Sequence, residues 1–106
     1  MHVINDVFFD ISQMLWLESP ANPTLALVDI GGIADAVHGK RTDIAIVVDN
    51  TFLTPVLQRP LELGADVVVY SCTKYLCGHA DVSMGVVTTS CQQLYEKIQE
   101  NQICMM

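Results

Sequence analysis

The sequence predicts an α/β fold: a mostly parallel sheet with flanking helices. Two uninterrupted runs of mainly β-branched residues, 44–48 and 67–70, are typical of strands buried on both faces of a parallel sheet. Segments with helical periodicity or helix-forming composition lie between and after the strand-like runs, and parallel strands require such crossover connections. Polar residues follow the runs directly. Ligands of open parallel sheets bind at that position, so we expect a site there.

Four strand-like runs follow one another along the chain, and each ends at a polar or proline-containing segment. They cover residues 15–18, 44–48, 67–70 and 85–89. Between the first two, apolar residues recur at three- and four-residue spacing, which predicts an amphipathic helix over 30–38. Asp29 is its expected N-cap and Gly39 its expected end.

Two further helical segments are expected. Residues 55–63 predict a short helix that is broken near Pro60 and ended by Gly64. Residues 92–102 have helix-forming composition. No repeat, low-complexity tract or linker divides the 106 residues, so we expect one domain or a piece of one.

Composition excludes several classes of protein. With 51% hydrophobic and 16% charged residues, the chain is too apolar for a disordered protein. A net charge of -7 without a basic cluster argues against nucleic acid and anionic membranes as partners. The N-terminal residues lack a secretory or transit pattern, so we expect a cytoplasmic protein. The four cysteines form no CxxC pair, which favours reduced thiols over zinc ligands or a disulfide framework.

A lysine and an aspartate follow neighbouring strands of the predicted sheet. Lys74 comes after a hydrophobic run and lies among small and hydroxyl residues, where partial desolvation would make its amine a better nucleophile. Its other interpretation is a surface lysine at a strand end. Asp49 ends the preceding run and would emerge at the same edge of the sheet, although it also suits a turn or an N-cap.

The two side chains together favour pyridoxal phosphate chemistry. This cofactor needs an amine for its Schiff base and a carboxylate at its ring nitrogen. Ser71 and Thr73, with nearby backbone amides, supply hydrogen-bond donors for its phosphate. A generic Rossmann-like nucleotide binder is the competing interpretation, but no GxGxxG motif follows any strand.

The stretch DVVVYSCTKYLCGH at 66–79 resembles the pyridoxal-phosphate attachment motif of the Cys/Met metabolism enzymes. That family includes cystathionine γ-lyase, cystathionine γ-synthase, cystathionine β-lyase and methionine γ-lyase. Residues 17–25 and 47–85 are similar to the family throughout, and to eukaryotic cystathionine γ-lyases in particular, so the resemblance covers residues 15–98. It implies part of the large cofactor domain of a fold-type I pyridoxal-phosphate enzyme, with residues 1–106 as a single incomplete domain.

The resemblance also implies roles for five residues. Lys74 would attach the cofactor and act as the catalytic base, Asp49 would pair with the pyridine nitrogen, and Ser71 and Thr73 would bind the phosphate. Asn22 matches the family asparagine near the cofactor hydroxyl and the substrate carboxylate.

Some positions near the motif depart from the family or have a structural role in it. Cys72 stands where the family usually has a small residue such as alanine, and Ala80 replaces a serine or asparagine. Tyr75 is expected to pack in the core. His79 is expected to be a hydrogen-bonded scaffold residue.

The expected parent reaction splits cystathionine into cysteine, 2-oxobutanoate and ammonia, and the resemblance implies a small amino-acid substrate and a homotetrameric family.

Several family site elements have no counterpart in the sequence: the phosphate-binding glycine turn, the tyrosine that stacks on the ring, the arginine for the substrate carboxylate, and the residues donated across the dimer interface. The isolated chain is therefore expected to be inactive. A noncatalytic fragment and a relative of the γ-synthase, β-lyase or methionine γ-lyase remain alternatives. Residues 2–7 faintly resemble an upstream family strand, with an internal deletion at 8–14.

Overall fold

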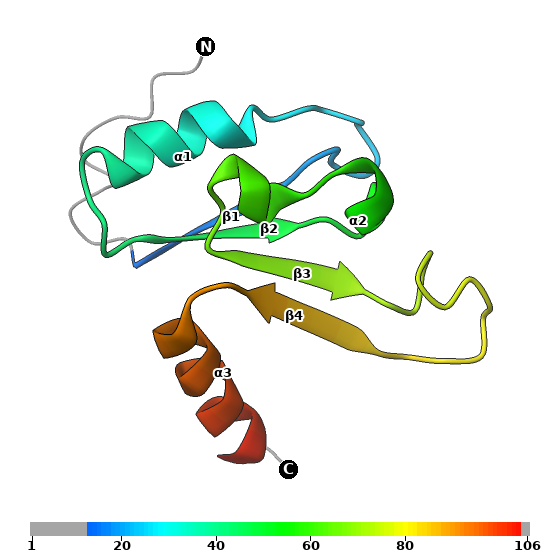
Figure 1. Cartoon of the computed structure of the whole chain (residues 1–106). Coiled ribbons are helices and arrows are strands. Elements are labelled where there is room, and N and C mark those ends of the chain that lie inside the picture. Colours follow the sequence, from blue (N-terminus) through cyan, green and yellow to red (C-terminus); the bar gives the residue numbers. More distant parts are fainter. Residues whose placement is uncertain (1–12, 105–106) are drawn as a thin grey trace.

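The computed structural model describes residues 13–104, which form a four-stranded sheet with helices packed on it (Figure 1). The elements in chain order are β1 (Met14–Glu18), α1 (Ile30–His38), β2 (Ala45–Asp49), α2 (Thr54–Leu57), η2 (Pro60–Leu63), β3 (Val67–Ser71), β4 (Gly85–Thr89) and α3 (Gln92–Cys104). All four predicted strands and all three predicted helical segments are confirmed, including the break near Pro60. The expected family resemblance of residues 2–7 falls outside the described residues. So does the expected internal deletion at 8–14, except for residues 13 and 14.

The strands lie in the sheet in the order β1-β2-β3-β4. β1, β2 and β3 run parallel, and β4 pairs antiparallel with β3, so the predicted mostly parallel sheet is confirmed. In the register, Asp49 lies between Glu18 on β1 and Val69 on β3. The carboxyl ends of the three parallel strands therefore meet at one edge of the sheet.

Helix α1 begins and ends as the sequence predicts. The Asp29 side chain accepts a hydrogen bond of 3.0 Å from the backbone N–H of Gly32, which satisfies one of the free donors of the first turn. Gly39 is the C-cap residue. The helix buries Ile30, Ala34 and Val37 on one side, as its apolar spacing requires.

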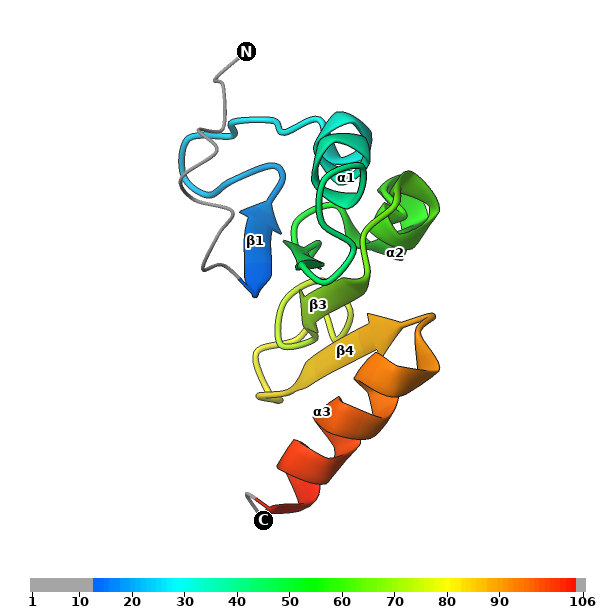
Figure 2. The same ribbon diagram turned by 90° about the vertical axis from the view of Figure 1, so that its left-hand side faces the viewer.

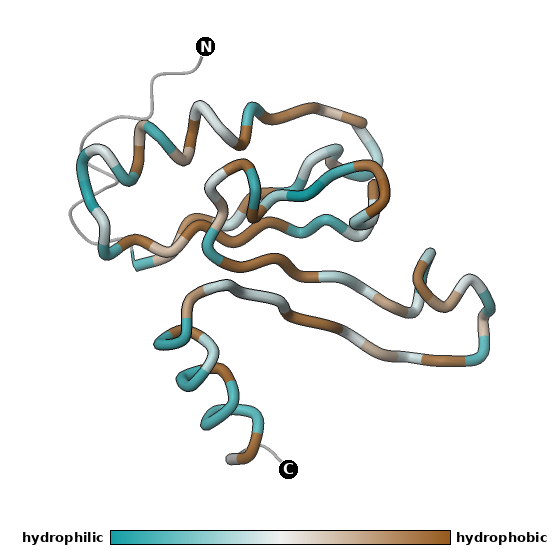
Figure 3. Tube along the Cα trace, viewed as in Figure 1, coloured by the Kyte–Doolittle hydropathy of each residue, from teal (hydrophilic) through white to brown (hydrophobic). Residues whose placement is uncertain are grey.

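The main core lies between α1 and the sheet. Val37, Ile46 and Val48 have no exposed surface, and they belong to one hydrophobic cluster. Helices α1 and α2 cover the same face of the sheet, and α3 extends away from the β4 edge (Figures 1 and 2). Figure 3 shows hydrophobic residues along the central strands and a mainly hydrophilic α3. Within residues 13–104, no helix has the length and apolarity that spanning a membrane requires.

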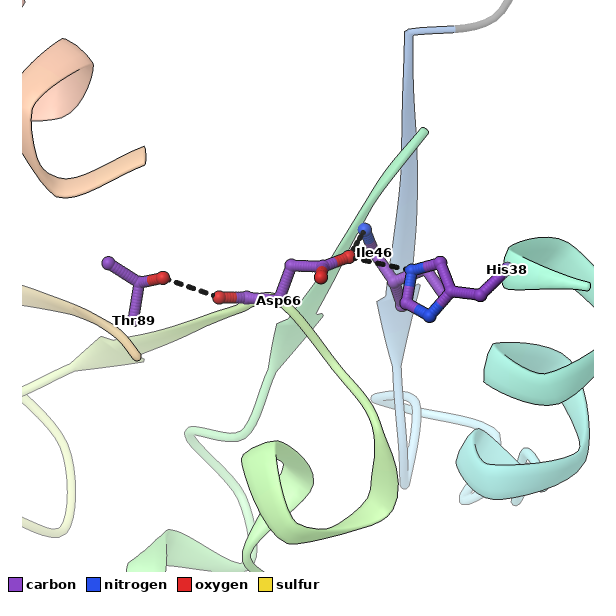
Figure 4. Close-up of polar contacts among 4 residues, drawn as sticks. All are labelled: His38, Ile46, Asp66 and Thr89. Carbon is purple, nitrogen blue, oxygen red and sulfur yellow. Dashed lines mark hydrogen bonds and ion pairs between the residues drawn. The ribbon is translucent and has the colours of Figure 1, made fainter. Parts of the chain in front are cut away.

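At the edge opposite the strands' carboxyl ends, Asp66 joins α1 and the three strands β2, β3 and β4 (Figure 4). Its Oδ2 accepts hydrogen bonds from the backbone N–H of Ile46 at 2.7 Å and from Nε2 of His38 at 3.0 Å. Its carbonyl oxygen accepts a 2.7 Å bond from the Thr89 hydroxyl. This one residue holds the helix and the strands in register at the end away from the predicted site.

Candidate functional site

A cavity of about 750 Å³ lies at the carboxyl ends of β1, β2 and β3. Its lining residues are Glu18, Asn22, Asp49, Thr51, Phe52, Ser71, Thr73, Lys74, Tyr75, Gly78, His79 and Ala80. The five residues proposed from the sequence, namely Asn22, Asp49, Ser71, Thr73 and Lys74, are all among them. The structure therefore brings together residues that are up to 52 positions apart in the sequence, from Asn22 to Lys74.

Asp49 is the last residue of β2 and is half-buried. Its Oδ1 accepts a hydrogen bond of 3.0 Å from the backbone N–H of Thr51, which is the turn contact that the alternative interpretation of Asp49 anticipated. An ionised carboxylate offers about four lone-pair sites, so this bond orients the group and leaves acceptor capacity for a ligand.

Thr51 connects Asp49 to the segment that carries Lys74. Its hydroxyl oxygen accepts a hydrogen bond of 2.8 Å from the backbone N–H of Ser71, while its own N–H binds Asp49. One residue thus holds both the carboxylate, through its backbone N–H, and the end of β3, through its hydroxyl. Thr51 was not among the residues expected at the site; its signal in the sequence is its place in the polar segment directly after a buried strand.

Ser71 and Thr73 lie on either side of the buried Cys72 at the end of β3. The Thr73 hydroxyl accepts a 3.0 Å hydrogen bond from the backbone N–H of Met84 and donates to the Met84 carbonyl at 3.4 Å. The second bond is long and therefore weak, so the hydroxyl can turn toward an anion at small cost. Both hydroxyl side chains line the same cavity.

Lys74 lies in the turn after β3. Its backbone N–H donates to the Ser71 carbonyl at 3.2 Å, and its carbonyl accepts from the Gly78 N–H at 2.8 Å, with Gly78 in the left-handed region at a φ of 67°. The side chain is exposed, so the expected partial desolvation of the amine is wrong for this chain. The physical reason is that this turn lies beyond the sheet edge, and none of the elements within residues 13–104 covers it.

Asn22 reaches the cavity from the segment after β1. The buried Ser19 hydroxyl anchors this segment by accepting a 3.0 Å hydrogen bond from the Val28 N–H. The backbone N–H of Asn22 lies 3.4 Å from Oε1 of Glu18, which also lines the cavity. Asn22 is exposed, so its amide is accessible to a ligand.

Asn50 supports the site from behind, and sequence reasoning did not assign it a role. It is fully buried, and its Nδ2 donates to the carbonyls of Thr54 and Gln58 at 3.1 and 2.8 Å and to the Tyr70 hydroxyl at 3.3 Å. Gln58 in turn donates to Oδ1 of Asn50 and to the Ser19 carbonyl, both at 2.9 Å. This network fixes the chain directly after Asp49.

An aromatic pair forms part of the cavity wall. The rings of Phe52 and Tyr75 meet edge to face, with centroids 6.2 Å apart and planes at 73°. Tyr75 is 65% exposed, so its expected packing in the core is wrong. It lies on the turn beside Lys74, outside the sheet's hydrophobic clusters. His79 is hydrogen bonded as expected, with Nδ1 at 2.9 Å from the Cys77 carbonyl.

The donor set of the cavity specifies the chemistry of a ligand. It combines a primary amine, a carboxylate and several hydroxyls, which suit a carbonyl group, a protonated ring nitrogen and an anionic group such as phosphate. Among residues 13–104, no three His, Cys, Asp or Glu side chains are grouped to hold a metal ion.

Comparison with known proteins gives consistent matches. A family model described as "Cys/Met metabolism PLP-dependent enzyme" matches residues 2–105. Human cystathionine γ-lyase is 51% identical over 87 residues, which are 82% of this chain and 21% of that protein. L-methionine γ-lyase of Pseudomonas deceptionensis is 53% identical over 87 residues, again 82% and 21% of the two chains.

Solved structures match in fold as well. Cystathionine γ-lyase from Lactobacillus plantarum, crystallised with L-serine, superposes with a TM-score of 0.82 at 41% identity; the match covers 88% of this chain and 24% of that one. The chain thus spans about a fifth of the length of the curated relatives it matches.

Proposed function

Because this chain belongs to the Cys/Met metabolism family of pyridoxal-phosphate-dependent enzymes, we propose that it carries the lysine-bearing part of a pyridoxal-phosphate site of the cystathionine γ-lyase type. One observation supports this most strongly: Lys74, Asp49, Ser71, Thr73 and Asn22 line a single cavity at the carboxyl edge of the sheet. The amine, the carboxylate and the hydroxyls of that cavity fit the aldehyde, the ring nitrogen and the phosphate of the cofactor.

Each of the five residues has a defined role in this proposal. Nζ of Lys74 binds the cofactor covalently, and Asp49 holds a proton on the ring nitrogen. Ser71 and Thr73 donate hydrogen bonds to the phosphate. Asn22 orients the cofactor hydroxyl and the substrate carboxylate through its amide.

When bound, pyridoxal phosphate supplies an electron sink for the bond-breaking steps at the substrate's α-carbon. The chain's contribution to that chemistry is a base and a fixed charge. The Lys74 amine, once free and neutral, takes up the α-proton of the substrate. Asp49 keeps its negative charge close to the ring nitrogen, and the Thr51 N–H bond at 3.0 Å holds the carboxylate in place for this.

In a complete enzyme, the proposed reaction splits cystathionine into cysteine, 2-oxobutanoate and ammonia. The matches include both cystathionine γ-lyases and a methionine γ-lyase, so the substrate class is a small sulfur-containing amino acid. We further propose that residues 1–106 are a single incomplete cofactor-binding domain of a cytoplasmic protein, with no nucleic acid or membrane partner.

The exposure of Lys74 favours a second candidate, a noncatalytic chain that binds the cofactor without turnover. Positioning of the reacting groups contributes up to roughly 7–11 kcal/mol to such reactions, and an exposed amine lacks much of that positioning. The two candidates share the cofactor and differ in product formation from cystathionine.

Reductive trapping tests whether the chain binds the cofactor at Lys74, which both candidates require. The chain is incubated with pyridoxal phosphate, reduced with borohydride and mapped by peptide mass. We expect one pyridoxyl group on Lys74, and a strong decrease of labelling in Asp49→Ala. Lys97 on α3 is the matched control, because it is also exposed but lies away from the cavity.

Equal labelling of Lys74 and Lys97, unchanged by Asp49→Ala, would contradict a specific cofactor site in the cavity. If Lys74 is labelled selectively, an assay for 2-oxobutanoate from cystathionine decides between the two candidates. Product at a rate that Lys74→Ala abolishes supports the lyase, and its absence supports the noncatalytic chain.

A further inference from the structure

Two cysteines frame the turn that carries Lys74. Cys72 lies two residues before the lysine and Cys77 three residues after it. Both are free thiols, and neither lines the cavity, so the proposed cofactor site does not use them. Cys72 is also one of the positions at which the sequence departs from the family it resembles, which usually has a small residue such as alanine there.

The backbone of the turn brings the two residues close together. The N–H of Cys77 donates a hydrogen bond of 2.9 Å to the carbonyl oxygen of Cys72. Standard bond lengths then keep the two Cα atoms within about 7 Å of each other. Disulfides usually join Cα atoms about 4.4–6.8 Å apart, so the pair is within reach of a crosslink after a small adjustment of the turn.

Both side chains also lie in the same environment. Cys72 is 3% exposed and belongs to a hydrophobic cluster with Val68 and Tyr70. Cys77 is partly buried and packs against that same cluster. Both side chains therefore contact the same hydrophobic cluster, and Cys77, the more exposed of the two, is the one that a reagent in solution reaches first.

We propose that Cys77 and Cys72 form a thiol–disulfide exchange site for low-molecular-weight disulfides such as glutathione disulfide. The Cys77 thiolate attacks one sulfur of the reagent, forming a mixed disulfide and releasing one glutathione thiolate. The Cys72 thiolate then attacks the Cys77 sulfur and releases the second glutathione. The protein loses two electrons and two protons, and these appear in the two glutathione thiols.

The product closes a small ring around the turn. Thr73, Lys74 and Tyr75 all lie inside the ring that a Cys72–Cys77 disulfide would form. Oxidation at this pair therefore restrains the same backbone that presents Lys74 to the cavity. Disulfide exchange at these two thiols does not depend on cofactor binding.

Oxidation of the full chain tests the proposal directly. The reduced protein is incubated with glutathione disulfide, quenched with an alkylating agent and mapped by peptide mass. In the unmodified sequence we expect loss of two hydrogens at Cys72 and Cys77, with no glutathionyl group retained on either. In Cys72→Ala we expect the first step only, so a glutathionyl group accumulates on Cys77.

Cys91→Ser is the matched control. Cys91 is an exposed free thiol just before α3, and its removal should leave oxidation of the pair unchanged. The same oxidation is repeated in concentrated guanidinium, where the two cysteines are close in sequence but no longer held together by the fold. We expect the ratio of internal disulfide to glutathionyl adduct to be lower under these conditions. Persistent glutathionylation of Cys77 in the unmodified sequence, or a ratio unchanged by denaturation, would overturn the proposal.

Discussion

The hydroxyl oxygen of Thr51 accepts a hydrogen bond of 2.8 Å from the backbone N–H of Ser71. The backbone N–H of the same residue donates to Oδ1 of Asp49, so Thr51 joins the ends of β2 and β3 at the edge where the cavity lies. The relative position of the Asp49 carboxylate and the Lys74 turn therefore depends on Thr51.

Replacing Thr51 with valine is expected to loosen this connection. The valine side chain has nearly the same shape as threonine but leaves the Ser71 N–H without its acceptor. We expect this to lower the free energy of unfolding by about 1–3 kcal/mol. Urea denaturation measures the loss, and borohydride trapping should show weaker labelling of Lys74. Thr51→Ser retains the hydroxyl and should restore both values; equal losses in the serine and valine variants would contradict the role of this bond.

Asn50→Leu should destabilise the chain more strongly. The side chain is fully buried, and its removal leaves the carbonyls of Thr54 and Gln58 and the Gln58 amide short of partners. We expect a loss of about 3 kcal/mol in unfolding free energy, measured by urea denaturation. The exposed Asn101 bonds one carbonyl on α3, and Asn101→Leu should change stability by less than about 0.5 kcal/mol. Similar effects of the two substitutions would show that the network contributes little.

Asp66→Ala tests the junction at the opposite edge of the sheet. It removes the acceptor of both the Ile46 N–H and the His38 ring, and we expect a loss of about 2 kcal/mol in thermal or urea unfolding. His38→Ala removes one of the two bonds and should cost less. Because the junction lies away from the cavity, labelling of Lys74 in the folded Asp66→Ala protein should be unchanged. Loss of labelling without loss of stability would be inconsistent with this structural role.

Asp43 provides a test of local electrostatics. The Arg41 side chain binds its carboxylate, with Nε at 2.8 Å from Oδ1, and holds the pKa of Asp43 at about 2. Arg41→Gln should raise this pKa toward 3.8, which an NMR titration of the carboxyl carbon measures. A lowered carboxyl pKa stabilises the fold at pH values above the unfolded pKa, and this contribution disappears as the pH falls through the folded pKa. The Arg41–Asp43 pair should therefore stabilise the fold near neutral pH and not below pH 2. A pKa unchanged by the substitution would show that another group lowers it.

The strands and helices followed from the sequence because their signals are local. The runs at 44–48 and 67–70 are apolar enough to identify central strands, and Asp29 and Gly39 mark the ends of α1. The carboxyl ends of parallel strands meet at one edge, so this topology also predicted that Asp49 and Lys74 would lie near each other.

The features that the sequence did not reveal depend on contacts between distant segments. Asn50 reads as an ordinary turn residue, and only the folded chain brings Gln58 and Tyr70 to its amide. Lys74 and Tyr75 were expected to be more buried than they are, because local hydrophobicity does not report what covers a turn. The antiparallel direction of β4 likewise has no signal in the composition of residues 85–89.

An NMR titration shows most directly whether the five residues from three segments form one cofactor site. Amide resonances of the isotope-labelled chain are followed while pyridoxal phosphate is added. We expect shifts concentrated at Asn22, Asp49, Ser71, Thr73 and Lys74, with residues of α3 and the Asp66 junction unaffected. Shifts scattered over exposed lysines, or confined to the surface between β4 and α3, would contradict it.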